Sequence, residues 1–231
     1  MTRELTFRVS ESAGEVSALL ERPDQARWLL VLAHGAGAGM RHAFMESLAG
    51  ELANAGMATL RYQFPYMQHR RGRPDPPAVL TATVCSAIGA AAETTPDLPL
   101  LAGGKSLGGR MTSHALSELP RSGATEALTR VSGLVLFGFP LHPPGQPDTK
   151  RADHLNRVTV PMLFLQGTRD ALADLSLMRP LCEGLAPRAT LHILDDADHS
   201  FHVLKRSGTT DADVLRDLAR ITASWADSLK V

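Results

Sequence analysis

A serine between two glycines offers the clearest chemistry in this sequence. Gly104-Lys105-Ser106-Leu107-Gly108 follows an apolar run and precedes a segment with a helical pattern. A serine on such a strand-to-helix turn presents its hydroxyl at a helix N-terminus, where main-chain amides favour developing negative charge. Glycine two residues before and two residues after it lets the strand and the helix approach closely. The spacing predicts Ser106 as a nucleophile and the amide of Leu107 as a donor to an oxyanion.

Two other interpretations compete for this segment. A phosphate-binding loop of the form G-x-x-x-x-G-K-S needs glycine at position 99, where the sequence has Pro99. A glycine-rich turn without chemistry is the second alternative, because the five-residue pattern arises by chance in roughly one such chain in ten. Its place between a strand and a helix favours the nucleophile.

An acid and a histidine follow Ser106 in the order that this kind of turn requires. Asp170 comes just after one apolar run, and His199 just after the next. Because parallel strands end at the same edge of a sheet, we expect both side chains near Ser106. An imidazole can take the serine proton, and a carboxylate can hold the imidazole in the required tautomer. The sequence thus predicts a catalytic triad.

Each partner has a competing interpretation. Asp170 is also placed to cap a helix that starts near Ala171. His202 competes for the role of base. The strand expected to end at Phe137 has no acid after it until Asp148, which favours Asp170 as the acid.

The second oxyanion donor is expected in the glycine-rich turn His34–Gly39, which follows another apolar run. Its amide belongs to Ala36 or Gly37, and the spacing leaves both open. His34 precedes the turn and is expected to be structural. The glycines at 35, 37 and 39 do not have the G-x-G-x-x-G spacing of a dinucleotide site.

Short apolar runs alternate with helical patterns along the chain. This order predicts an α/β fold with a mostly parallel sheet, right-handed crossovers and helices on both faces, in one domain over residues 1–231. An antiparallel hairpin is expected at the sheet edge, from Leu5–Val9 and Val16–Leu20. Helices are expected around Met45–Leu52, from Pro77 onward and over Val214–Leu229. The six predicted inner strands are Trp28–Ala33, Ala58–Tyr62, Leu98–Ala102, Val131–Phe137, Met162–Leu165 and Thr190–Leu194.

Two irregular segments, Phe64–Pro77 and Phe139–Asn156, both follow strands and are expected to wall the substrate pocket. No segment is long enough to form a helical lid. The three arginines at 70, 71 and 73 either meet a substrate carboxylate or belong to a solvated loop. The predicted substrate contacts are Phe64, Tyr66, Met67, Phe139 and His142.

The bulk composition narrows the function classes. The 231 residues carry 24 basic and 24 acidic side chains, which gives no broad basic face for nucleic acid. The N-terminus has no apolar signal segment, and no apolar run is long enough to span a bilayer, so a cytoplasmic location is expected. Two cysteines give no disulfide framework. We expect the reaction to need no metal and no cofactor. The expected partner is a small ester substrate, and the sequence leaves the oligomeric state open.

Six ordered motifs resemble those of the small lidless α/β-hydrolases related to dienelactone hydrolase and to the testis-expressed hydrolase-like proteins. The resemblance implies the α/β-hydrolase fold and serine-hydrolase activity, with a departure, since dienelactone hydrolase has a cysteine where this chain has Ser106. A hydrolase of carboxylic esters, with small or medium acyl or lactone-type substrates, is therefore expected. The alternatives are a non-enzymatic interaction protein and a transacylase or peptidase. The motifs are His34–Met40, Arg61–Met67, Gly103–Arg110, Phe139–Gly145, Gln166–Asp170 and Asp198–Phe201.

Overall fold

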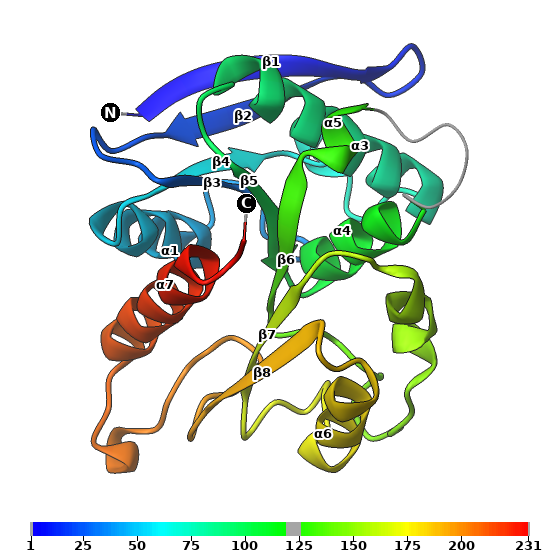
Figure 1. The fold of residues 1–231 in the computed structure, drawn as a ribbon. Coiled ribbons are helices and arrows are strands. Elements are labelled where there is room, and N and C mark those ends of the chain that lie inside the picture. Colours follow the sequence, from blue (N-terminus) through cyan, green and yellow to red (C-terminus); the bar gives the residue numbers. More distant parts are fainter. Residues whose placement is uncertain (1, 119–125, 231) are drawn as a thin grey trace.

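An eight-stranded sheet forms the centre of the computed structural model, which describes residues 2–118 and 126–230 (Figure 1). The strand order is β1-β2-β4-β3-β5-β6-β7-β8. Strands β3 to β8 are parallel to one another, whereas β2 pairs antiparallel with both β1 and β4. The strands are β1 (Thr2–Ser10), β2 (Gly14–Glu21), β3 (Trp28–Ala33), β4 (Met57–Tyr62), β5 (Leu100–Lys105), β6 (Val131–Phe137), β7 (Met162–Gly167) and β8 (Ala189–Leu194).

The predicted sheet is confirmed, with the β1–β2 hairpin at one edge. Strands β3, β4, β5 and β7 are buried at every residue. Layers of helices cover both faces, which explains why these strands are mostly apolar and do not alternate with polar residues. The outermost strand, β8, is instead partly exposed at alternate residues.

Helices pack on both faces of the sheet. The core on one face includes residues of α1 (Ala43–Asn54) and α7 (Asp211–Asp227). The opposite core includes α3 (Pro77–Thr94), α4 (Leu107–Ser117) and α6 (Leu175–Gly184). Figure 1 shows α1 and α7 together on one side of the sheet and α3 and α4 on the other. The short helices are α2 (Pro65–Gln68), α5 (Glu126–Thr129), η1 (Lys150–Arg157) and η2 (Lys205–Ser207).

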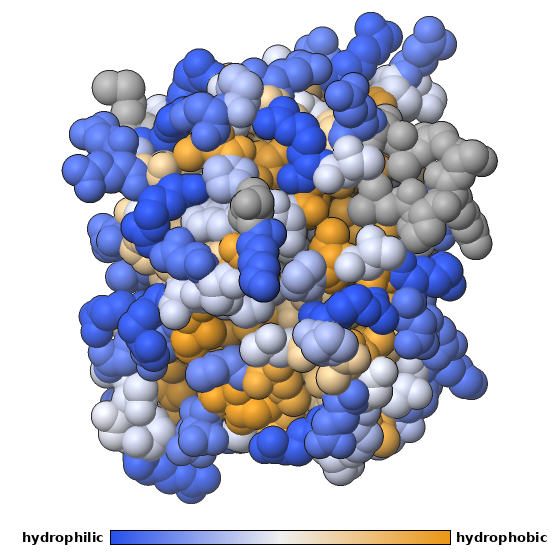
Figure 2. Space-filling view, viewed as in Figure 1, coloured by the Kyte–Doolittle hydropathy of each residue, from blue (hydrophilic) through white to orange (hydrophobic). Residues whose placement is uncertain are grey.

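Helix α3 is the one candidate membrane span among the described residues. Its 18 residues have a mean hydropathy of 1.2, so its length and composition alone would suit a bilayer. The helix contacts β1, β3, β4 and α4, and it is one of the layers that bury the sheet. Figure 2 shows hydrophilic residues over much of one face of the molecule, with apolar patches between them in both its upper and its lower half.

The start of β3 is joined to the end of α7. Arg27 Nη2 lies 2.9 Å from Asp227 Oδ2, and the indole N–H of Trp28 donates to Asp227 Oδ1 at 3.0 Å. These groups are about 200 residues apart in the sequence. The contact fastens α7 over the face of the sheet that holds Leu30, Leu32 and Leu101 in its core.

Candidate active site

Ser106 lies on a sharp turn between β5 and α4. Its φ of 50° and ψ of −115° are strained for a residue with a side chain. The packing around this turn explains why the residues two before and two after Ser106 are glycines, as the sequence predicted. A Cβ at Gly104 would lie 2.6 Å from the carbonyl oxygen of Ala33, and one at Gly108 would lie 2.5 Å from the same atom. Only glycine lets β3, β5 and α4 meet this closely, so the turn holds Ser106 at the carboxyl edge of the sheet.

The structure brings Ser106, His199 and Asp170 together in one hydrogen-bonded chain. His199 Nε2 is 2.8 Å from Ser106 Oγ, and His199 Nδ1 is 2.7 Å from Asp170 Oδ2. Asp170 follows β7 and His199 follows β8, so the neighbouring strands deliver the two side chains to the same edge. The Asp170 side chain is 1% exposed and that of His199 is 24% exposed. This arrangement can move a proton from the serine hydroxyl to the imidazole.

Two further donors hold the Asp170 carboxylate. Gln166 Nε2 donates to Oδ2 at 2.5 Å, and the Leu172 amide donates to Oδ1 at 2.8 Å. This role of Gln166 was not predicted from its motif, although a glutamine inside a buried strand is a signal of a polar partner. Asp170 does not cap a helix, because α6 begins only at Leu175 and Asp174 is its cap. Its hydrogen bonds instead fix its orientation toward the imidazole.

The competing acid and base lie elsewhere. Asp148 accepts a hydrogen bond from the Lys150 amide at 3.0 Å on the surface. His202 pairs with Asp211, with 2.8 Å between Nδ1 and Oδ2, and both side chains are more than half exposed. The carboxylate of Asp198 accepts from the amide of His202 at 3.0 Å, as a turn-forming aspartate does.

The glycine-rich turn after β3 favours Ala36 over Gly37 as the second oxyanion donor. The Gly37 amide donates to the hydroxyl of Tyr66 at 3.0 Å. Ala36 lines the cleft that also contains Ser106. Leu107 is the first residue of α4, so its amide has no acceptor within the helix. With the Gly37 amide occupied, the amides of Ala36 and Leu107 remain the candidate oxyanion donors.

His34 is buried beneath this turn. Its Nδ1 lies 2.7 Å from the carbonyl oxygen of Gly35, and its Nε2 accepts a hydrogen bond from the Phe64 amide at 3.2 Å. Burial lowers the pKa of His34 to about 4, so the ring is neutral near pH 7. One ring nitrogen contacts the turn and the other contacts the segment after β4, so His34 joins the two segments, which fits a structural role.

The cleft beside Ser106 has a volume of about 380 Å³. Its apolar wall comes from Phe44 and Met45 of α1 and from Leu172 after β7. The complete lining is Gly35, Ala36, Ala38, His42, Phe44, Met45, Lys105, Ser106, Leu172, His199 and Ser200.

The five predicted substrate contacts are absent from this lining, so that prediction is corrected. Pro65 begins the short helix α2, which turns Phe64 and Tyr66 into the core at 0% and 1% exposure. Met67 packs against the same core. Phe139 is 1% exposed and packs on Phe164, with ring centroids 6.0 Å apart.

His142 is also an interior group rather than a pocket residue. It is 3% exposed, and its Nε2 accepts from the Asp174 amide at 2.9 Å. The arginines at 70, 71 and 73 are exposed. Arg71 Nη2 lies 2.7 Å from Asp75 Oδ1, and Asp75 is itself buried under the loop. For these arginines the structure favours the solvated loop.

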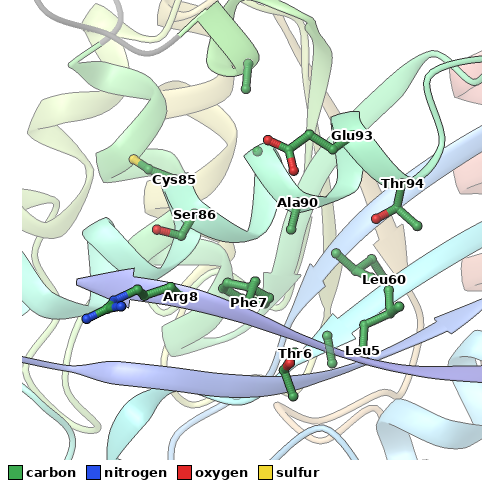
Figure 3. A pocket seen from close by; sticks show the side chains of 13 residues that line it. Leu5, Thr6, Phe7, Arg8, Leu60, Cys85, Ser86, Ala90, Glu93 and Thr94 are labelled. Carbon is green, nitrogen blue, oxygen red and sulfur yellow. The ribbon is translucent and has the colours of Figure 1, made fainter. Parts of the chain in front are cut away.

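A larger cleft lies between β1 and α3. It measures about 580 Å³, and its lining includes Leu5 to Arg8 of β1 and one side of α3, namely Cys85, Ser86, Gly89, Ala90, Glu93 and Thr94 (Figure 3). None of Ser106, Asp170 and His199 lines it. Burial raises the pKa of the Cys85 thiol in its wall, which makes that thiol a weak nucleophile. Over residues 2–118 and 126–230, no cluster of three or more His, Cys, Asp or Glu side chains could hold a metal ion.

Comparison with known proteins agrees with this architecture. Residues 26–227 match a family described as an alpha/beta hydrolase domain. A dienelactone hydrolase from Anabaena variabilis superposes with a TM-score of 0.72 at 22% identity, over 99% of both chains. A lidless serine hydrolase from Xanthomonas campestris gives 0.71 at 19% identity, over 100% of this chain and 96% of the other. The esterase domain of a Rhodothermus marinus protein gives 0.72 at 16% identity, over 99% of each.

Proposed function

Because this chain belongs to the α/β-hydrolase domain family and shares the fold of a lidless serine hydrolase, we propose that it is a serine esterase acting on carboxylic esters. In this proposal Ser106 is the nucleophile, His199 the general base and Asp170 the acid that orients the base. The observation that carries it is the continuous hydrogen-bonded chain from Ser106 Oγ through the imidazole to Asp170. Esterases and a dienelactone hydrolase among the structural neighbours support the same class of substrate.

The reaction begins when Ser106 Oγ attacks the ester carbonyl carbon while His199 Nε2 takes the hydroxyl proton. The amides of Leu107 and Ala36 stabilise the resulting oxyanion. When the intermediate collapses, the C–O bond to the alcohol breaks and the imidazolium gives its proton to the leaving oxygen. This step leaves an acyl group on Ser106.

Water completes the cycle. The neutral imidazole of His199 removes a proton from water as the water oxygen attacks the acyl carbon. The second tetrahedral intermediate releases the carboxylic acid, and the proton returns to Ser106 Oγ. Asp170 stabilises the imidazolium in both halves of the reaction without taking the proton itself.

The cleft favours neutral esters with small or medium acyl chains. Phe44, Met45 and Leu172 offer apolar contact in a volume of about 380 Å³. The cation in the lining is Lys105, whose ammonium already donates to a main-chain oxygen at 2.5 Å. Asp170 and Asp198 also attract this ammonium, so Lys105 offers a substrate carboxylate little net attraction.

Labelling with a fluorophosphonate tests the proposal. The reagent should form one adduct, which mass spectrometry locates on Ser106. The rate of p-nitrophenyl butyrate hydrolysis should fall in proportion to the fraction of Ser106 that is labelled. Ser106→Ala should lose both reactions. Ser224→Ala serves as the control, because Ser224 is exposed on α7 and should leave both unchanged. Ester hydrolysis that survives Ser106→Ala in the folded protein would refute this assignment.

A further inference from the structure

Lys105, the residue before Ser106, is a buried cation next to the main chain of His199. It is 9% exposed, and its Nζ donates to the main-chain carbonyl oxygen of His199 at 2.5 Å. The ammonium also lies 5.3 Å from the ring centroid of Phe201 and 5.9 Å from that of Phe44. These two rings stack on each other with an interplanar angle of 12°. A lysine side chain is rarely buried without such a set of partners.

Gly138 leaves the space that brings the ammonium near the imidazole. A Cβ at this glycine would lie 3.1 Å from Lys105 Nζ and 3.6 Å from Cε1 and Nδ1 of His199. The Lys105 ammonium and the His199 ring therefore both face the backbone of Gly138, which follows β6. A Cβ at position 138 would crowd the ammonium and touch the imidazole at an ordinary contact distance.

Two carboxylates compensate the buried charge. Asp170, after β7, and Asp198, after β8, both attract the Lys105 ammonium, while burial lowers the pKa of Lys105 to about 8. The cation is thus tied by charge to the acid and by a hydrogen bond to the main chain of the base. Lys105 therefore connects the turn that carries Ser106 with the two loops that carry Asp170 and His199.

We propose, on the basis of the esterase assignment above, that Lys105 is a positioning residue that holds His199 against Ser106. The charge-assisted bond to the His199 carbonyl oxygen fixes the base loop, so that Nε2 stays within 2.8 Å of the serine oxygen. Small displacements of a catalytic group can reduce the rate by about a hundredfold. The position between the glycine and the serine of the nucleophile turn is therefore a determinant of catalysis.

Three variants test this role. Lys105→Met keeps the length of the side chain without its charge, and Lys105→Arg keeps the charge. Lys150→Met is the matched control, because Lys150 is exposed on η1. With p-nitrophenyl butyrate, Lys105→Met should lower kcat by about ten- to a hundredfold and change KM by less than about twofold. Lys105→Arg should recover most of kcat, and the control should match the wild type.

The alkaline side of the pH profile gives a second readout. As the pH rises through about 8, the wild-type ammonium loses its proton and its bond to His199 weakens. We expect kcat to fall by about threefold between pH 7 and pH 9.5 in the wild type, and to stay level in Lys105→Arg, whose guanidinium remains charged. A lysine that only filled space would not produce this difference.

The outcomes separate the two proposals. If fluorophosphonate labels Ser106 and folded Lys105→Met keeps the wild-type kcat, the role of Lys105 is wrong and the esterase assignment stands. If Ser106 does not react in the wild type, the esterase assignment itself fails. Should Lys105→Met not fold, the comparison of the wild type with Lys105→Arg decides, and identical alkaline profiles overturn the role of Lys105.

Discussion

At the scale of single residues, the site is organised around the carboxylate of Asp170. Its two oxygens accept hydrogen bonds from Gln166, Leu172 and His199. These donors leave the carboxylate one orientation, in which it faces Nδ1 of the imidazole. A buried carboxylate held in this way can select the tautomer of the base and stabilise its charged form.

Asp170→Asn should therefore lower kcat by about 10³- to 10⁴-fold, since an amide can hold the imidazole in the wrong tautomer. Asp148→Asn is the matched control and should stay within about twofold of the wild type, because Asp148 only caps the Lys150 amide on the surface. Steady-state kinetics with p-nitrophenyl butyrate check both. Similar losses in the two variants would show that another acid serves the base.

At the scale of elements, the contact between β5 and α4 depends on glycine. Gly104→Ala places a Cβ 2.6 Å from the Ala33 carbonyl oxygen and 2.8 Å from the carbonyl carbon of Gly108. We expect a loss of more than about 3 kcal/mol in the free energy of unfolding, because neither backbone atom can move away cheaply. Urea denaturation measures the change.

Gly50→Ala is the control for this prediction. Gly50 lies inside α1 with no atom within 4 Å of the added Cβ. Alanine there should raise the free energy of unfolding by about 0.5 to 1 kcal/mol through helix propensity. If Gly104→Ala were as well tolerated as Gly50→Ala, the close approach described for the nucleophile turn would be incorrect.

The sequence predicted the elements well where burial is continuous. The runs Trp28–Ala33 and Val131–Phe137 coincide with β3 and β6. The strand predicted to end at Ala102 continues to Lys105, because Gly103 and Gly104 pair with β6 although their side chains give no strand signal. Ser106, Asp170 and His199 could be proposed because parallel strands end at one edge and their loops are short.

The pocket walls could not be predicted in the same way. Phe64 and Tyr66 follow a strand, but Pro65 begins a helical turn that carries their rings into the core. The residues that line the cleft include Phe44 and Met45 of α1, which are distant from Ser106 in the sequence. The supporting roles of Gln166 and Lys105 depend on the three-dimensional path of loops, which periodicity does not report.

At the scale of the whole molecule, buried neutral histidines make the free energy of unfolding depend on pH. Burial lowers the pKa of His34 to about 4 and is the largest cause that lowers that of His154 to about 3. Unfolded histidines titrate near pH 6.5. Below that pH the unfolded chain binds protons that the folded chain does not, so the folded state loses stability as the pH falls.

The free energy of unfolding should decline by up to about 1.4 kcal/mol per pH unit for each of these histidines between pH 6.5 and about 4. His154→Gln removes one titrating group and should make the decline shallower. His202→Gln is the control, since Asp211 raises the pKa of exposed His202, and its removal should not make the decline shallower. Urea unfolding at pH 7.5, 6.5, 5.5 and 4.5 measures the slopes, and equal slopes in the wild type and His154→Gln would contradict the argument.

The lidless fold makes a prediction about substrate size. Without a lid to open, rates should rise smoothly with ester concentration and show no jump when the substrate forms micelles. With a cleft of about 380 Å³, p-nitrophenyl acetate to hexanoate should be better substrates than palmitate. Leu172→Ala widens the cleft and should shift the preference toward longer chains. Activation at an interface, with palmitate preferred, would contradict an open cleft.

The link between Arg27 and Asp227 also affects how this protein can be made. At about 5 to 20 residues per second, a ribosome needs roughly 10 to 40 seconds to synthesise the 200 residues between the two partners. During that time the apolar face of the nascent sheet that α7 later covers is open to chaperones and to other emerging chains. His199 emerges only shortly before α7. Closure of the core and assembly of the hydrolytic site therefore wait for the same late stage of translation.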